Sequence, residues 1–436
     1  MPFVELGDKL ELLAASARYD ASCASSGSSR SSGGIGAASP AGVCHSWTGD
    51  GRCVSLLKVL YSNSCSKDCV YCANRASADI QRASFAVEEL VRLTIGFYRR
   101  NYIEGLFLSS GIFADPDIVM ERLIEVARTL REREGFGGYI HLKAIPGCGN
   151  KLLKKAGLFA DRLSVNIELP TASSLARLAP QKSGIEILGA MRFMAEAESQ
   201  TKEDIRRFRG RREAPIFAPA GQSTQLVVGA SMDDDRTIVR LASSLYGKMG
   251  LRRVYYSAFV PVSSDPRLPA LASPPLLREH RLYQADWLLR FYGFRAEELL
   301  HEAEPNFPMD IDPKTSWALR HPEFFPVDID LAEYSELLRV PGVGVTGAGR
   351  IVATRRSGRV RPEDLARMGI VVKRARWFLS TGGRPLYAFG ADPVAHAPEP
   401  DRLRKILAEA RSNGTAPRRP SQAAGTTAPQ LEFAFP

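Results

Sequence analysis

Three cysteines stand together in residues 65–72 (CSKDCVYC), directly after an apolar run. Thiolates are soft ligands that select zinc, copper(I) or iron–sulfur clusters. A structural zinc site usually closes with four protein ligands, and no fourth Cys or His stands just behind this segment. A zinc knuckle and unrelated surface thiols remain the alternatives. The spacing favours a [4Fe–4S] cluster held by Cys65, Cys69 and Cys72, with one iron left open for an additional ligand.

This C-x3-C-x2-C spacing, with Tyr71 directly before the last cysteine, resembles the signature of the radical S-adenosylmethionine (radical SAM) enzymes. The resemblance implies that SAM binds the open iron through its amino and carboxyl groups. One electron from a flavodoxin- or ferredoxin-type reductant would then cleave SAM to a 5′-deoxyadenosyl radical, which removes a hydrogen from the substrate. A [4Fe–4S] cluster and SAM are the cofactors expected on this basis, and no further catalytic side chain is assigned.

Strand and helix patterns alternate from residue 53 onward. The expected strands cover residues 54–61, 105–108, 139–144, 162–168, 225–230 and 253–259. The helices between them are expected at residues 85–100, 116–133, 151–156, 185–198 and 233–249. Six β/α repeats predict a parallel sheet with helices outside it, as an open sheet or a partial barrel. Radical SAM enzymes typically use a partial (β/α)6 TIM-type barrel, so the expected fold class is α/β.

Chemistry in such barrels takes place at the carboxyl ends of the strands. The resemblance implies SAM contacts there from Tyr71, from the turn Ser109-Ser110-Gly111, from Asn166 and Glu168, and from Gly229. The turn departs from the Gly-Gly-Glu pattern of the superfamily, because serines replace the first glycine and no acid is present. Each of these positions also has a local explanation, as a turn, a cap or a close packing point.

Further along, Tyr139, His141 and Lys143 alternate on the third expected strand. They face the barrel interior in this arrangement, either toward a substrate or as ordinary filling of the barrel. No catalytic role is assigned to them.

The remaining cysteines are separate from this cluster. Cys23, Cys44 and Cys53, with His45 or Cys148, are candidates for a second metal site. Their spacing matches no known framework, so ordinary buried or free thiols are the alternative.

The composition excludes several classes. Of the 436 residues, 44% are hydrophobic and 24% charged, as in ordinary globular proteins. The sequence has no run of 18 apolar residues, so no membrane span is expected. Its N-terminus has no basic-then-apolar leader, so secretion is not expected. Seven cysteines, three of them in one cluster, do not suit a disulfide framework. We therefore expect a cytoplasmic protein, and its net charge of +10 favours an anionic partner.

A second informative stretch, residues 337–351 (LLRVPGVGVTGAGRI), resembles the helix–hairpin–helix motif of DNA repair and recombination proteins. A Pro-Gly-x-Gly hairpin at a helix start presents backbone N–H groups that suit a DNA phosphate. Such contacts read no sequence, so binding would be largely sequence-independent and sensitive to salt. The expected DNA contacts are Pro341, Gly342, Gly344, Thr346 and Arg350.

Charge supports this interpretation, because residues 331–385 contain eleven Lys and Arg against four Asp and Glu. A protein–protein hairpin is the alternative. Two other basic stretches are weaker candidates. Residues 206–212 are interpreted first as a solvated loop, and the aromatic, arginine-rich helix at 276–294 first as a packed helix that closes the barrel.

Taken together, the chain resembles a family called DNA modification/repair radical SAM proteins, whose reaction is not established. Besides the cysteine loop and the hairpin, the resemblance rests on residues 19–23 (YDASC), 72–75 (CANR), 139–143 (YIHLK), 217–224 (FAPAGQST) and 278–287 (REHRLYQADW). It implies a radical SAM enzyme that acts on DNA, with a flipped or single-stranded nucleotide entering the barrel. The alternatives are an iron–sulfur DNA-binding protein with a structural or redox-sensing cluster, or a radical SAM enzyme that acts on tRNA or protein.

The expected organisation has five parts. They are an N-terminal helix with a Ser/Gly-rich segment (1–52), the partial barrel (53–260), a linker with a barrel-closing helix (261–330), an all-α helix–hairpin–helix module (331–385), and a short helix with a disordered tail (386–436).

Overall fold

The computed structural model describes residues 5–17, 43–47, 53–207, 216–389 and 398–412. Within these residues the centre is a seven-stranded sheet, ordered from β1 to β7 as in the chain. Its strands are β1 (Val43–Trp47), β2 (Cys53–Leu60), β3 (Gly105–Ser109), β4 (Tyr139–Lys143), β5 (Arg162–Ser164), β6 (Gln222–Val228) and β7 (Arg253–Ala258). Strands β2 to β7 are parallel, and β1 is antiparallel to β2.

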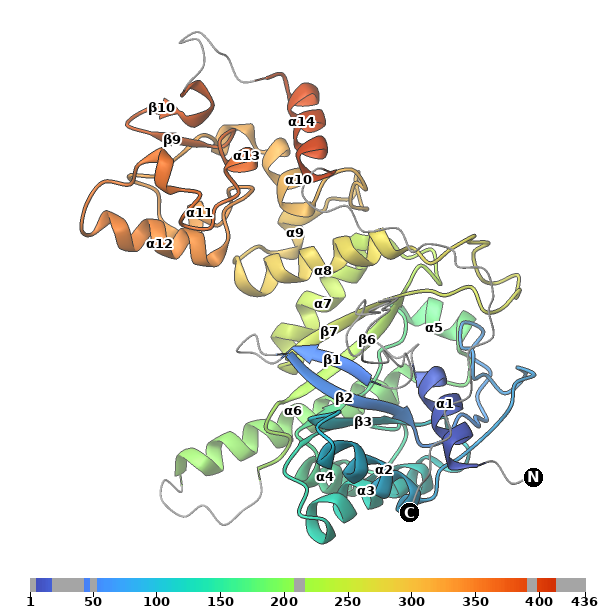
Figure 1. The fold of residues 1–436 in the computed structure, drawn as a ribbon. Coiled ribbons are helices and arrows are strands. Elements are labelled where there is room, and N and C mark those ends of the chain that lie inside the picture. Colours follow the sequence, from blue (N-terminus) through green and yellow to red (C-terminus); the bar gives the residue numbers. More distant parts are fainter. Residues whose placement is uncertain (1–4, 18–42, 48–52, 208–215, 390–397, 413–436) are drawn as a thin grey trace, which may run out of the picture.

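The sheet curls without closing, because β1 and β7 remain its two edges. Helices follow the strands and pack outside the sheet (Figure 1). They are α2 (Val87–Arg99), α3 (Pro116–Arg128), α4 (Asn150–Phe159), α6 (Gly184–Arg207) and α7 (Asp235–Met249). The short helix α5 (Ala172–Leu178) instead packs against the loop that follows β2, where Leu178 and Val70 share a small apolar cluster. The N-terminal helix α1 (Leu6–Ala17) packs against β2. The predicted α/β class with a partial (β/α)6 barrel is confirmed.

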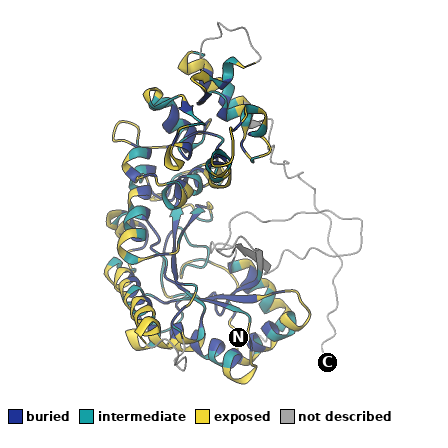
Figure 2. Cartoon of the chain, turned by 90° about the vertical axis from the view of Figure 1, so that its left-hand side faces the viewer, coloured by how far each residue is buried: buried dark blue, intermediate teal, exposed yellow. Residues whose placement is uncertain are grey.

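The two faces of the sheet differ in chemistry, because alternate residues of a strand point to opposite sides. On the outer face, residues such as Leu106 and Leu142 belong to the large core shared with the helices. On the inner face, Leu56 and Phe107 form a separate small cluster against Tyr139. Figure 2 shows the buried sheet and the exposed outer sides of the helices. The outer face holds the fold together, which leaves the inner face available for polar side chains.

The open edge at β7 is covered by side chains. The Tyr283 hydroxyl of α8 (Leu276–Phe291) accepts a hydrogen bond from Tyr256 N–H at 3.1 Å and donates one to Tyr256 O at 2.9 Å. The Glu279 carboxylate accepts from Ala258 N–H at 2.6 Å. These bonds satisfy backbone groups that an edge strand would otherwise leave free for pairing with another chain.

Several elements differ from the sequence expectation. Neither β1 nor α5 was predicted, α6 extends to Arg207, and a π-helical turn (Thr129–Arg133) prolongs α3. Strand β5 has only three residues, and the chain rejoins the sheet later through a single bridge between Glu168 and Leu226. The expected strand at 162–168 is therefore interrupted, which places Glu168 in an unusual backbone conformation.

The C-terminal part combines helices with a small sheet. Its helices are α9 (Ala296–Leu299), α10 (Pro313–Arg320), α11 (Tyr334–Leu337), α12 (Val345–Arg355), α13 (Val372–Ala375) and α14 (Pro400–Ser412). Strands β8 (Val327–Asp328), β9 (Leu379–Thr381) and β10 (Arg384–Pro385) form a three-stranded sheet that the expected all-α module did not include. None of the described helices combines the length and apolar character needed to cross a membrane.

Candidate active site

The cysteine loop, residues 62–78, follows β2 at the carboxyl edge of the half-barrel. Neighbouring loops hold its backbone. Ser66 N–H donates to Ile112 O at 2.7 Å, and Val70 N–H donates to Leu178 O at 3.0 Å. The loop is thus fixed from two sides, by the segment after β3 and by the end of α5.

Arg82 fixes the backbone of the same loop through hydrogen bonds. Its guanidinium donates to the carbonyl oxygens of Asn63 at 2.6 Å, Asn74 at 3.0 Å, Arg75 at 2.7 Å and Ala78 at 3.0 Å. A planar guanidinium with five donors suits such a cluster of carbonyls. No sequence motif marks this residue, because its partners are backbone atoms that leave no residue pattern.

The three thiols are free, with Cys69 buried and Cys65 and Cys72 partly buried. Burial raises the pKa of Cys69, and it raises that of Cys72 to about 12, while the charge of Lys182 acts against both shifts. These two thiols are therefore protonated at neutral pH. Loading a metal cluster onto them must release protons.

Within the described part of the chain, no three His, Cys, Asp or Glu side chains lie close enough to share one metal ion. A [4Fe–4S] cluster binds each thiolate at a different iron, so its ligands stand further apart than those of one ion. Three soft donors on one loop match the number of protein ligands that such a cluster has when one iron is left open.

Tyr71 connects the loop to Glu168, in the segment that follows β5. Its hydroxyl donates to Glu168 Oε2 at 3.2 Å, and Lys182 Nζ donates to Glu168 Oε1 at 2.5 Å. Burial raises the Tyr71 pKa well above its ordinary value, and the Glu168 charge adds to this. Burial alone would lower the Lys182 pKa, but the Glu168 carboxylate keeps it raised. Tyr71 and Glu168 are both among the predicted SAM contacts, whereas Lys182 is not.

Glu168 has a positive φ of 67°, which is rare for a residue with a side chain. Its backbone is fixed by two bonds to β6, from Glu168 N–H to Gln225 O at 3.1 Å and from Val227 N–H to Glu168 O at 2.7 Å. Strain of this kind persists where the surroundings impose it, and it concentrates at functional sites. Its carboxylate is thereby directed toward the cysteine loop.

Asn166 precedes this bend, and its Oδ1 atom is buried without a hydrogen-bond partner. A buried acceptor of this kind usually has a partner in the complete protein. Donors on a cofactor, such as ribose hydroxyls, would satisfy it. This unpartnered Asn166 oxygen is the best support in the structure for a bound group beside the loop.

Two other predicted contact points have local explanations. A Cβ on Gly111 would stand 2.2 Å from Ser64 O, and one on Gly229 would stand 2.7 Å from Pro275 Cγ. Both glycines are therefore required by close packing. Ser110 Oγ donates to Gly111 O at 2.7 Å, and Ser109 is buried. The Ser109–Gly111 turn supports the cysteine loop, and SAM contact from it stays a prediction.

The second metal site predicted at Cys23, Cys44 and Cys53 is not tested. Cys23 lies outside the described residues, and for Cys44 and Cys53 only the backbone in β1 and β2 is described. Cys148 is a free thiol in the main core, where apolar packing accounts for it.

The predicted hairpin joins α11 to α12. Gly342 has a φ of 89°, and a Cβ there would stand 2.7 Å from Val371 O. The hairpin packs against α8 and α10. Lys314 Nζ donates to Val343 O at 2.6 Å, and Gly344 lies beside the Tyr292 hydroxyl. The Tyr292 hydroxyl accepts a hydrogen bond from Val345 N–H, so the donors at the start of α12 are partly satisfied by the protein itself.

The other predicted DNA contacts differ in access. Pro341 is buried, whereas Thr346 and Arg350 are exposed, and Arg350 donates to Met368 O at 3.1 Å. Seven cations of this C-terminal module are exposed, namely Arg350, Arg356, Arg359, Arg361, Arg367, Lys373 and Arg384. Its exposed charge, more than its hairpin amides, is available to a polyanion.

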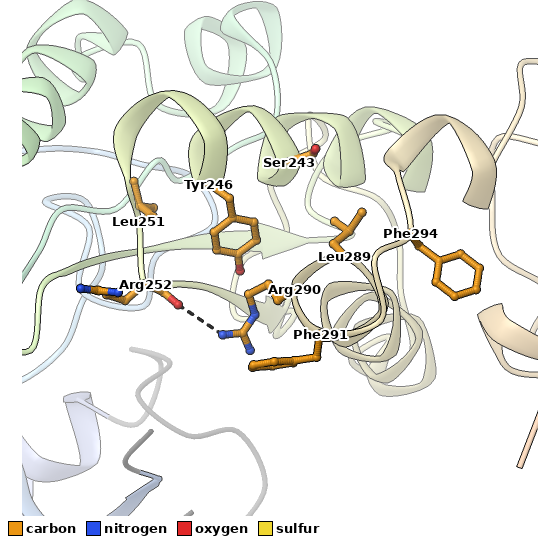
Figure 3. A pocket seen from close by; sticks show the side chains of 8 residues that line it. All are labelled: Ser243, Tyr246, Leu251, Arg252, Leu289, Arg290, Phe291 and Phe294. Atoms are coloured by element: carbon orange, nitrogen blue, oxygen red, sulfur yellow. Dashed lines mark hydrogen bonds between the residues drawn. The ribbon is translucent and has the colours of Figure 1, made fainter. Parts of the chain in front are cut away.

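A pocket of about 360 Å³ lies between α7 and α8 (Figure 3). Arg252, Arg290 and Phe291 are among its lining residues, and Arg290 Nη1 donates to Arg252 O at 3.2 Å. Arg252 directly precedes β7, so the pocket opens at the amino edge of the sheet. The cysteine loop lies at the opposite edge, and the pocket is not part of this candidate site.

No protein-family model and no curated protein matches the chain. Among solved structures, it resembles HydG, a maturase of the [FeFe]-hydrogenase (17% identity, TM-score 0.39, 53% of this chain and 48% of that one). It also resembles methylornithine synthase PylB (14% identity, TM-score 0.39, 83% of this chain and 82% of that one). A third similar structure is TsrM from Kitasatospora setae, a radical S-adenosylmethionine methyltransferase with cobalamin and a [4Fe–4S] cluster bound (12% identity, TM-score 0.32, 81% of this chain and 60% of that one). The match spans about half the length of HydG, and at these identities the likeness concerns the fold alone.

Proposed function

We propose that this chain is a radical SAM enzyme in which Cys65, Cys69 and Cys72 hold a [4Fe–4S] cluster. The observation that carries the proposal is the cysteine loop itself. It presents three free thiols at the carboxyl edge of a half-barrel. An iron that lacks a protein ligand accepts an exogenous one, which suits a cosubstrate such as SAM.

When bound, the cluster supplies the electron that cleaves SAM to a 5′-deoxyadenosyl radical. The chain's residues do the positioning. Arg82 holds the loop geometry, and the ion pair of Lys182 and Glu168 would offer an ammonium and a carboxylate to the zwitterionic end of SAM. Asn166 Oδ1 would accept a hydrogen bond from a ribose hydroxyl of bound SAM. Buried walls around these groups keep water from a reactive radical.

We further propose DNA as the macromolecular partner, through the exposed cations of the C-terminal module. Seven exposed Lys and Arg residues would neutralise phosphates along a duplex without reading sequence. A tRNA or protein substrate is the alternative within the same chemistry. The electron donor would be a flavodoxin- or ferredoxin-type protein. A reducing cytoplasm suits both the free thiols and such a donor.

The test of the enzymatic part uses the full chain, reconstituted anaerobically with iron and sulfide. Addition of dithionite and SAM is expected to yield 5′-deoxyadenosine and methionine. The Cys148→Ser variant should behave like the parent, because Cys148 packs in the apolar core and is not part of the cysteine loop. An iron–sulfur protein with a structural cluster would show the cluster absorbance without forming 5′-deoxyadenosine.

The DNA part is tested separately. Stimulation of 5′-deoxyadenosine formation by DNA, or salt-dependent binding to a duplex, would support it. If tRNA stimulates turnover and DNA does not, the DNA assignment is wrong while the radical chemistry stands.

A further inference from the structure

The inner face of the half-barrel is strongly cationic. The six parallel strands contain four Lys and Arg residues, Lys58, Lys143, Arg162 and Arg253, and no Asp or Glu. All four belong to the inner face. Lys58 and Lys143 place their ammonium groups 5.9 and 6.0 Å from the Phe107 ring centre. Strand register aligns Arg162 with His141 and Arg253 with Ser223.

His141 lies among these cations as a neutral group. Its Nε2 atom lies 2.8 Å from Ser164 Oγ, and its ring packs edge-on against Phe107 at 4.4 Å. Burial lowers its pKa well below the ordinary value, and the charges of Arg162, Lys143 and Lys58 lower it further. The imidazole therefore adds no charge of its own, and the inner face remains positive.

Three hydrogen-bond donors on this face are buried without a partner. They are Arg162 Nε, Ser223 Oγ and Arg253 Nε, on the adjacent strands β5, β6 and β7. Ser223 is fully buried. Buried donors left unsatisfied are unfavourable, and native proteins rarely retain them without a ligand or ordered water.

The anionic side chains near Arg162 do not neutralise its charge. Tyr139 bonds to Arg162, but burial raises the Tyr139 pKa to about 12, so its phenol is uncharged at neutral pH. The charge of Glu198 also reaches Arg162. Glu198 belongs to α6, however, and its carboxylate pairs with Lys202 at 3.7 Å. The inner face is also partly open, because Tyr139, Lys143, Arg162 and Arg253 retain intermediate exposure.

We infer that the inner face, at Arg162, Ser223 and Arg253, is a binding site for a phosphate ester carried by the substrate. The inference rests on the proposed radical SAM function, because it concerns the molecule that the barrel would receive. A phosphate offers several acceptor oxygens and up to two negative charges, which match three donors and four cations. A single carboxylate would satisfy fewer of them.

Position adds a constraint on the substrate. Arg162 and Arg253 begin their strands, whereas the cysteine loop follows the far end of β2. Five residues of β7 separate Arg253 from the carboxyl edge, or about 17 Å at 3.3 Å per residue. The phosphate thus lies deep in the half-barrel, with the reacting part of the molecule nearer the loop. An internal nucleotide of a long strand cannot reach so deep with its phosphate, so the group belongs to a free nucleotide-sized molecule or to a strand terminus.

The experiment measures binding to the full chain by calorimetry, without SAM or reductant. Inorganic phosphate is the first probe, followed by deoxyadenosine 5′-monophosphate against deoxyadenosine. We expect saturable binding of the two phosphates and none of the nucleoside. Comparing a 5′-phosphorylated with an unphosphorylated oligonucleotide then separates a strand terminus from a free nucleotide as the source.

Two variants test the site itself. Ser223→Ala should weaken phosphate binding about tenfold and leave thermal stability unchanged, because its hydroxyl has no partner in the protein. Arg253→Met should weaken binding at least as much. Arg252→Met is the matched control, since this neighbouring arginine is exposed on the other side of the strand.

Loss of binding in the first two variants and not in the control is the expected result. Absence of saturable phosphate binding, or an equal loss in Arg252→Met, would overturn the inference. Equal affinity for acetate and phosphate would also overturn it, in favour of a general anion site. Because no turnover is measured, a failure here is distinct from a failure to cleave SAM.

Discussion

The half-barrel and the C-terminal module both concentrate positive charge, in opposite environments. The four cations of the sheet point inward, whereas seven cations of the module are exposed on its surface. Inward cations with unsatisfied donors favour one small anion in a fixed position. Exposed arginines favour a long polyanion, held by charge and weakened by salt. The difference shows that net charge alone does not identify a partner, because burial decides which kind of anion each region can take.

The largest expected effect is at the cysteine loop. Cys69→Ser should lower 5′-deoxyadenosine formation at least about 100-fold, because ligand loss exceeds the 10- to 100-fold typical of outer-sphere changes. Iron and sulfide content and cluster absorbance should fall in parallel. Retained cluster and retained turnover in this variant would remove Cys69 from the ligand set.

The second largest effect is expected at the ion pair of Glu168 and Lys182 beside the loop. Glu168→Gln leaves Lys182 partly buried without its partner, and this should lower the free energy of unfolding by about 3 kcal/mol. Denaturant unfolding measures it. Adding Lys182→Met should recover part of the loss, since the uncompensated charge is then gone. No recovery in the double variant would show that backbone strain, and not charge, dominates at this position.

The hairpin offers a test within the module. Gly342→Ala should destabilise the protein by about 2 kcal/mol, because alanine disfavours a φ of 89° and its Cβ would contact Val371 O. Gly349→Ala is the matched control. It lies on α12 with nothing within 4 Å of an added Cβ, so it should be neutral or slightly stabilising. Thermal unfolding of both variants distinguishes a structural hairpin from an unconstrained one.

The buried histidine predicts a pH dependence. The folded-state pKa of His141 lies well below its ordinary value of 6.5, because of burial and the nearby cations. Between these two pKa values the unfolded state binds the extra proton, so stability rises with pH up to about 6.5 and is constant above it. Each pH unit below 6.5 should remove about 1.4 kcal/mol. His141→Gln should abolish this component in unfolding measurements at pH 5.5 and 7.5, and an unchanged slope would contradict it.

The smallest effect is expected for single exposed cations. Arg356→Gln or Arg359→Gln should weaken duplex binding only a few-fold and reduce the salt dependence by about one unit of slope. Binding measured at several salt concentrations tests this. A loss that is large and independent of salt would mean a specific contact, and the contrast between the two regions would then fail.

The β/α alternation made the fold predictable, because six apolar strand patterns recurred with helices between them. Cys65, Cys69 and Cys72 were equally readable, since their spacing is local. Lys182 and Arg82 could not be predicted, because folding alone brings their partners near. Lys182 pairs with the Glu168 carboxylate, and Arg82 bonds to backbone carbonyl oxygens. The bend at Glu168 was also hidden. A continuous strand was expected at 162–168, and the break depends on backbone bonds to β6 that no local pattern encodes. Strand β1 escaped for a similar reason, since its pairing with β2 is what defines it.

The most direct measurement is the product analysis of the reconstituted full chain, incubated anaerobically with dithionite and SAM. We predict 5′-deoxyadenosine and methionine in equal amounts, both absent from the Cys65→Ser, Cys69→Ser and Cys72→Ser variants. A protein that carries an intact cluster with all four irons ligated by side chains, and that leaves SAM untouched, would contradict it.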